Sequence, residues 1–253
     1  DPAAVEARLK ADAKHSIKAI FVVQIDTATS VVNDLPAIRK AIDAAGHPAL
    51  LMVDTVASLG CMPYEMDAWG VDVTMCGSQK GLMTPPGLAL VAAGPRAMEA
   101  HKSANMRTMY WDWTFRDGPE HYQKYCGTPP EHTIFALRKA VDLLFAEGLE
   151  NAHRRHALLA EATRRAVAKW CEGQVLAFNI IDPTQRANSV TNVLTHSVNP
   201  QSILDYCREK CGVVLGVGIG DLTGKAFRIA HMGHTNAPMV LGTLAAVEMA
   251  LKA

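Results

Sequence analysis

The residues whose types and spacing best suit chemistry lie in "VDVTMCGSQKGLMTPPGL", which covers Val71 to Leu88. Lys80 stands there between Gly77 and Gly81, after an apolar run typical of a strand and before a Pro-Pro-Gly turn. Glycine lets the backbone bend sharply and approach a bound group closely, which a solvated surface lysine does not need. A lysine amine that is desolvated in such a loop becomes a nucleophile.

A carboxylate ends the preceding apolar run, "PALLMVD", where Asp54 is the last residue. Ligands of open α/β sheets bind at the carboxyl ends of the strands, so Asp54 and Lys80 are predicted to lie at one edge. An amine that forms an imine and a carboxylate that keeps a pyridine nitrogen protonated are what pyridoxal phosphate requires. A turn-capping Asp54 and a solvated Lys80 would give the same spacing, so the residue types leave both interpretations open.

The elements that must position these residues alternate along the first half of the chain. Asp34–Gly46 has helical spacing, with aspartate at its start and glycine after its end. The predicted strands are Ile17–Ile25, Pro48–Asp54, Val71–Cys76 and Gly87–Gly94. Near-continuous apolar strands separated by helices or long crossovers predict an α/β domain with a mainly parallel sheet covered on both faces.

The pattern of predicted helices and strands changes at about Pro130. Two long helical patterns, Ile134–Gly148 and Glu150–Trp170, are followed by shorter strands and a last helix. These later segments are Ser189–Thr195, Gly212–Leu215, Ala226–His231 and Pro238–Lys252. The pattern predicts a second, smaller α+β domain over residues 131–253, after a first domain over residues 1–130.

Composition narrows the class of protein and of ligand. The chain has 253 residues, 49% of them hydrophobic, and its 25 basic side chains balance 25 acidic ones. Zero formal charge argues against nucleic acid or an anionic membrane as partner and favours small ligands. The six cysteines form no Cys-x-x-Cys pair, which fits reduced thiols and a cytoplasmic location. The histidine pairs of "HRRH" and "HMGH" have no acidic or cysteine ligands beside them, so we expect no metal site.

A family resemblance covers the segment around the lysine. "VDTVASLGCMPYEMDAWGVDVTMCGSQKGLMTPPGLALVA" (Val53–Ala92) resembles the cofactor segment of class V aminotransferases of fold type I, in particular the serine–glyoxylate and alanine–glyoxylate group. It has the Asp-x-x-x-Ser element, the "MDAWGVDV" link and the "GSQKG" and "PPGL" lysine loop in the family's order. The resemblance implies that Lys80 binds pyridoxal 5'-phosphate covalently, that Asp54 pairs with the pyridine nitrogen, and that Gln79 lies against the cofactor.

A turn near the N-terminus also matches the family. "DTATSV" (Asp26–Val31) resembles the Glu-Thr/Ser-x-Thr/Ser-Gly-Val turn that follows a strand. By that resemblance Thr27 hydrogen-bonds the ring oxygen of the cofactor. Asp26 stands in place of the usual glutamate and Ser30 in place of the usual glycine, so the resemblance does not fix the fine shape of this loop.

Two more segments match residue by residue. "YCGTPP" (Tyr125–Pro130) resembles the segment through which one subunit reaches the phosphate in its neighbour's site, which implies a homodimer with roles for Tyr125 and Thr128. "GKAFRIAHMG" resembles the strand whose arginine, here Arg228, binds the substrate's α-carboxylate. A guanidinium suits that task because its fork of donors matches a carboxylate. From spacing alone, an arginine in a strand also fits a structural ion pair.

The resemblance implies ping-pong transamination between a small amino acid, such as serine or alanine, and a 2-oxo acid such as glyoxylate or pyruvate. The family's phosphate-cradling loop and ring-stacking aromatic have no counterpart here. We therefore expect residues 1–130 to be the C-terminal part of the cofactor-binding large domain, and residues 131–253 the linking helix and small domain. A pyridoxamine–pyruvate aminotransferase, which shares "DT" and "RIAHMG", and a non-catalytic truncated remnant are the alternatives.

Overall fold

The computed structural model describes the whole chain, Asp1–Ala253, and its residues divide into two compact units. Unit 1 consists of Asp1–Val22, Asp34–Thr55 and Glu65–Leu143. Unit 2 consists of Val23–Asn33, Val56–Tyr64 and Leu144–Ala253. Two short segments from the N-terminal half therefore belong to the same unit as the C-terminal residues.

Unit 1 is built on a four-stranded sheet with the order β1-β4-β5-β6. Its strands are β1 (Ala19–Val23), whose last residue belongs to unit 2, β4 (Leu50–Asp54), β5 (Val73–Gly77) and β6 (Ala89–Ala93). β4 and β5 are parallel, whereas β5 and β6 are antiparallel. Its helices are α1 (Pro2–Lys10), α2 (Leu35–Ala44), α3 (Pro95–His101), α4 (Trp113–Arg116), α5 (His121–Tyr125) and α6 (Glu131–Glu147), whose last turn belongs to unit 2. β6 is largely exposed, so the expected cover on both faces does not extend along this strand.

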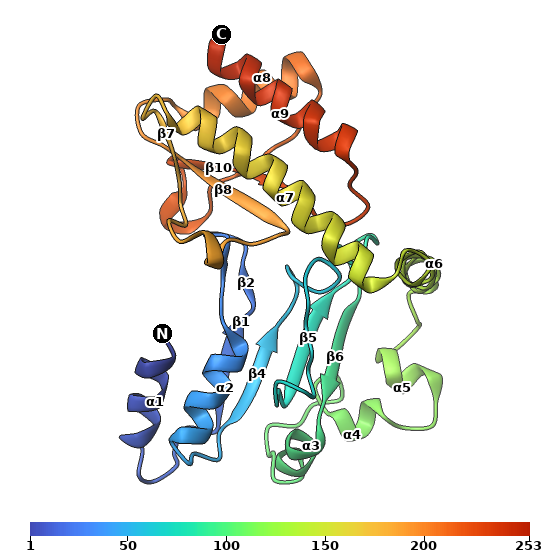
Figure 1. Cartoon of the computed structure of the whole chain (residues 1–253). Coiled ribbons are helices and arrows are strands. Elements are labelled where there is room, and N and C mark those ends of the chain that lie inside the picture. The colour runs from blue at the N-terminus through green and yellow to red at the C-terminus, as the bar shows by residue number, and fades with distance from the viewer. The chain divides into compact units, whose positions relative to one another are not determined.

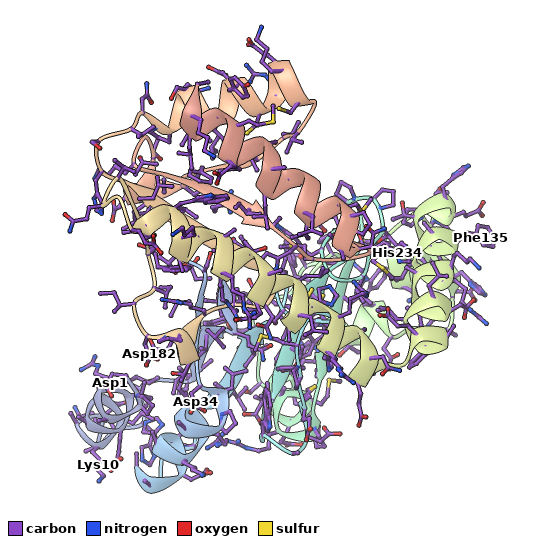
Figure 2. All side chains as sticks on the ribbon, turned by 45° about the horizontal axis from the view of Figure 1, so that its top comes forward. Asp1, Lys10, Asp34, Phe135, Asp182 and His234 are labelled. Atoms are coloured by element: carbon purple, nitrogen blue, oxygen red, sulfur yellow. The ribbon has the colours of Figure 1, made fainter.

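α2 shows how the sequence fixes an element of this unit. Asp34, at the start of α2 in Figure 2, accepts a hydrogen bond from Ala37 N at 2.9 Å, a cap that contributes about 1 kcal/mol. Three apolar side chains at helical spacing, Leu35, Ile38 and Ile42, are buried. Gly46 has a φ of 60° just after the helix, a conformation that glycine adopts readily. The helix predicted between this aspartate and this glycine is thereby confirmed.

Unit 2 is built on an antiparallel sheet with the order β7-β8-β10-β9. Its strands are β7 (Leu176–Phe178), β8 (Val190–Thr195), β9 (Gly216–Val217) and β10 (Ala226–Ala230), and its helices are α7 (Leu149–Cys171), α8 (Pro200–Cys211) and α9 (Ala237–Lys252). Short 3-10 turns lie at Pro183–Gln185 and Gly220–Leu222. A separate hairpin joins β2 (Ile25–Asp26) to β3 (Val31–Val32).

The core of unit 2 lies between its sheet and its helices. Figure 1 shows α7, α8 and α9 gathered over one side of the sheet. Fully buried side chains meet there from every layer, among them Val167, Val193, Ile203, Phe227 and Val247. Because side chains of a strand alternate between its faces, the neighbours of Val193 and Phe227 point away from this core.

Two sequence-based expectations about strands need correction. Gly212–Leu215 is not a strand, because Gly212 (φ 65°) ends α8 and Val213 N returns to Cys207 O at 2.9 Å, so these residues form the helix exit. The strand predicted over Ile17–Ile25 is divided into β1 and β2 at Gln24, whose carbonyl and side chain bond to other loops.

The long helices predicted after Pro130 are confirmed as α6 and α7, which are separated by Gly148 at a φ of 86°. Phe135, on α6 in Figure 2, is 74% exposed. None of the helices combines the length and the apolar character that crossing a bilayer demands.

Candidate functional site

In unit 1 the lysine lies in a loop that begins where β5 ends, and Ser78 closes this loop. Ser78 is fully buried, and its Oγ donates to Pro85 O at 2.8 Å. Thr84 donates to Ser78 O through its Oγ1 at 2.6 Å and through its backbone N at 3.0 Å. Met83 N donates to Lys80 O at 3.0 Å, with Met83 itself at a φ of 59°. The loop is therefore held by its own hydrogen bonds, with Lys80 half-buried at its first turn.

Sequence reasoning missed the role of Ser78 as the residue that organises the loop. The available signal was a small polar residue directly after a buried strand and before Gln79-Lys80. Hydroxyls at such positions bond nearby backbone groups and shape turns.

The Gln79 side chain lies over Gly77. A Cβ on Gly77 would lie 2.8 Å from Gln79 Oε1, so the Gln79 side chain folds back over this glycine. Gln79 itself is exposed. One glycine of the pair around Lys80 thus makes room for a neighbouring side chain.

Asp54 lies at the same edge of the sheet as the lysine loop. β4 and β5 run parallel with Asp54 opposite Met75, so both strands end on this side. Just beyond Asp54, the backbone N and Oγ1 of Thr55 donate to Met75 O at 2.8 and 2.9 Å. Burial raises the pKa of the neighbouring Cys76 thiol, and the charge of Asp54 adds to that shift. The two groups predicted from the sequence to share one edge do so within unit 1.

Tyr125 is the last residue of α5, and Thr128 lies in the turn that follows; both are exposed and belong to unit 1. Cys126 takes a left-handed conformation at the end of α5, with a φ of 57°, and Gly127 N returns to Tyr122 O at 2.8 Å. The turn presents both side chains to the surface. It is not part of the sheet edge that carries Asp54 and Lys80.

In unit 2 the predicted cofactor turn is closed by its aspartate. The carboxylate of Asp26 accepts from Ala28 N at 3.0 Å, Thr29 N at 3.3 Å and Thr29 Oγ1 at 2.7 Å. Ser30, where the family has glycine, takes the left-handed conformation at a φ of 67°, and its N donates to Asp26 O at 2.7 Å. The two departures from the family pattern are therefore accommodated, and Thr27 lies at the tip of this turn, half-buried.

Arg228 is brought to this turn from β10. Its Nη1 donates to Thr27 O at 2.8 Å, and its Nε donates to Val217 O at 2.8 Å. Gly216 lies opposite Arg228 in the ladder, and a Cβ there would be 3.2 Å from Arg228 Cβ and 3.4 Å from Nε. Burial lowers the pKa of the Arg228 guanidinium, while the charge of Asp26 opposes the shift. Two residues that the sequence predicted separately, Thr27 and Arg228, are in contact within unit 2.

The chain is similar in sequence to a known family of enzymes. The sequence signature of the family Aminotransferase class-V matches residues 4–229. The chain is 42% identical over 258 residues to "Serine--glyoxylate aminotransferase" of Methylorubrum extorquens. The matched region covers 99% of this chain and 63% of that protein. It is 39% identical over 246 residues to "L-aspartate--glyoxylate aminotransferase" of Paracoccus denitrificans, over 96% of this chain and 61% of that protein.

A solved structure extends the likeness to three dimensions. The pyridoxamine-pyruvate aminotransferase of Mesorhizobium loti is 29% identical, with a TM-score of 0.86, over 100% of this chain and 64% of that one. The chain thus spans somewhat more than three-fifths of the length of the relatives it matches. Its α/β architecture is that of the fold type I aminotransferases. By sequence and by fold, the chain belongs to the class-V aminotransferases.

Proposed function

We propose that the protein carrying this chain transfers the amino group of a small amino acid to a 2-oxo acid, with pyridoxal 5'-phosphate as cofactor. The donor would be serine, alanine or a similar amino acid, and the acceptor glyoxylate or pyruvate. The observation that carries the proposal is the joint position of Asp54 and the Lys80 loop at one sheet edge in a class-V chain. The names of the curated relatives, both glyoxylate aminotransferases, support the acceptor.

The residues present fit this cofactor. A half-buried amine in a loop fixed by Ser78 and a carboxylate at the end of the neighbouring parallel strand supply a covalent anchor and a partner for a protonated ring nitrogen. The exposed side chain of Gln79, folded over Gly77, offers an amide beside the anchor. When bound, pyridoxal phosphate supplies an electron-withdrawing ring that stabilises negative charge at the substrate Cα.

The roles of the chain's own residues follow from their chemistry. Lys80 would hold the cofactor through Nζ and, once released, would take the proton from the substrate Cα as a general base. Asp54 would keep the ring nitrogen protonated, because a carboxylate nearby favours the charged form of a base. Thr27 would donate its hydroxyl to the ring oxygen. Arg228 would orient the substrate carboxylate with those guanidinium N–H groups that Thr27 O and Val217 O leave available.

We also propose a homodimer in which Tyr125 and Thr128 reach the phosphate in the partner's site. Their exposure at the end of α5 and in the turn that follows supports a role outside their own unit. As domains we propose residues 1–130, the C-terminal part of the large domain, and residues 131–253, the linking helix and small domain. The six cysteines are all free, which supports a reducing location such as the cytoplasm.

The first experiment is borohydride reduction of the protein incubated with pyridoxal phosphate, followed by peptide mapping. A pyridoxyl group on the peptide that contains Lys80 is the expected result. Lys80→Ala should remove both the label and the turnover, whereas Lys18→Ala, in the same unit, is the control that should change neither. Turnover near the wild-type rate in Lys80→Ala would refute the assignment, and absence of any label would favour the non-catalytic alternative.

The second candidate function is pyridoxamine–pyruvate transamination. It is favoured by the solved structure with a TM-score of 0.86 and by "DT" and "RIAHMG", which resemble that group. The two functions differ in whether free pyridoxamine is a substrate. Pyruvate-dependent formation of pyridoxal from pyridoxamine, with no reaction of serine or alanine, would establish the second function and overturn the first.

A further inference from the structure

Three polar side chains form a row across the sheet of unit 2. β8 pairs with β10 so that Asn192 lies opposite Arg228. β8 also pairs with β7 so that Val193 lies opposite Phe178, and the next position sets Asn179 beside Asn192, with Asn179 N donating to Asn192 O at 3.4 Å. Asn179, Asn192 and Arg228, here called the donor row, lie on the face away from the core, because their neighbours Val193 and Phe227 are buried in it.

Each member of the donor row binds a different carbonyl of the cofactor turn. Arg228 Nη1 donates to Thr27 O at 2.8 Å. Asn192 Nδ2 donates to Ala28 O at 2.5 Å, and Asn179 Nδ2 donates to Thr29 O at 2.9 Å. The next carbonyl, Ser30 O, accepts from Ala187 N at 3.1 Å. Consecutive carbonyls of the turn are thus fixed by one sheet and the loop beside it.

The other side of the turn is fixed as well. The Asp26 carboxylate accepts from the N–H groups of Ala28 and Thr29, and Asp26 O accepts from Ser30 N. With both the N–H and the C=O groups bonded, the backbone of the turn has little freedom. The side chain of Thr27 is not used in this network, which leaves its hydroxyl for another partner.

Asn192 is the central member of the donor row and the most buried, at 3% exposure. The Ala28 carbonyl fixes the orientation of its amide, because the opposite orientation would set Oδ1 against a carbonyl oxygen. Asn192 Oδ1, Ser30 Oγ and Arg164 Nε have no partner within the chain, and these residues line one small cavity. One buried water can donate to the amide oxygen, accept from the N–H and bond the hydroxyl, which would give all three groups a partner.

We propose that the donor row is a positioning device for Thr27, with Asn192 as its central positioning residue. The proposal rests on the proposed function, in which Thr27 contacts the cofactor ring oxygen. Arg228 would then bind both the substrate carboxylate and the Thr27 carbonyl. Substrate binding and the position of Thr27 would therefore depend on the same guanidinium. Neither asparagine touches the reacting atoms in this scheme.

The first test measures the turn itself by hydrogen–deuterium exchange in protein without added cofactor. Asn192→Ala should speed exchange of the peptide over residues 25–32 by about fivefold, the equilibrium factor of the ~1 kcal/mol that one hydrogen bond contributes. Asn179→Ala, at the half-buried end of the row, is a milder variant and should act in the same direction. Asn199→Ala is the matched control, because Asn199 caps α8 in the same unit by accepting from Gln201 N at 3.0 Å, and it should leave this peptide unchanged.

The second test measures the position of Thr27 in protein loaded with pyridoxal phosphate. A hydroxyl that donates to the ring oxygen favours its deprotonated form, so displacement of Thr27 should move the absorbance titration of the bound cofactor to higher pH. Asn192→Ala should show this shift and several-fold weaker cofactor affinity, whereas Asn199→Ala should show neither, even where it lowers stability. Faster exchange with an unchanged titration and affinity would make the row merely structural and would overturn the proposal. If the wild-type protein that carries this chain binds no cofactor, the proposed function is refuted. Unchanged exchange in Asn192→Ala would refute the positioning of the turn in either case.

Discussion

Ser30 gives a sharp test of the conformation of the cofactor turn. This residue is 4% exposed, has a φ of 67° and bonds through its backbone to Asp26 O and Ala187 N. An L side chain in the left-handed region costs about 1–2 kcal/mol, whereas glycine costs about 0.5–1 kcal/mol more chain entropy on folding. The difference predicts that Ser30→Gly is more stable than Ser30→Ala by about 1 kcal/mol.

The comparison of Gly with Ala at this position isolates the backbone. Both variants remove the hydroxyl, which is buried and has no partner within the chain, so the loss of this group cancels between them. For a chain of this size, ~1 kcal/mol corresponds to about 2–4 °C in the melting temperature, which calorimetry or a urea titration resolves. Ser202 in α8 is the control, because at a helical position Ala should be the more stable residue. Ser30→Ala as stable as Ser30→Gly, with the expected order at Ser202, would refute the left-handed conformation of this turn.

The remaining predictions concern the arginine, the glycine opposite it and a buried histidine. Arg228→Ala should weaken capture of both the amino acid and the oxo acid by about 10- to 100-fold in kcat/KM, because a charge-assisted pair contributes about 1.5–3 kcal/mol; unchanged affinities would contradict its role. Gly216→Ala should raise KM for the substrate, because the new Cβ would lie 3.2 Å from Arg228 Cβ. Gly242→Ala is the control and should leave KM unchanged, because nothing lies within 4 Å of a Cβ at that position. Equal KM values in the two variants would contradict this prediction. Burial lowers the pKa of His231 to about 3, below its unfolded value of about 6.5, so the unfolded chain binds the extra proton and stability should fall as the pH drops from about 6.5 toward 3. His231→Gln should reduce this loss of unfolding free energy at acid pH, measured by urea titration at a series of pH values. An equally steep loss in the variant would show that His231 does not titrate in this way.

How much was predictable depends on whether a feature is local. The apolar strands, the cap of α2 and the glycines on either side of Lys80 depend on residues that are neighbours in the sequence. These features could therefore be predicted from the sequence alone. The position of Asp54 and Lys80 at one edge followed from a general property of parallel strands. Gly212–Leu215 was misassigned because apolar residues at a helix exit resemble a short strand, and only the left-handed Gly212 distinguishes the two.

The donor row could not be predicted for a related reason. Asn179, Asn192 and Arg228 lie on three strands or their ends, and only the register of the sheet makes them neighbours. No single segment carries their pattern, and asparagine in a strand has no preferred partner by type alone. Once the register is known, their function follows from their hydrogen bonds, because the turn presents consecutive carbonyls that each need a donor. The aspartate in place of glutamate and the serine in place of glycine are tolerated because such a turn is held from both sides, so its shape depends less on any one of its own residues.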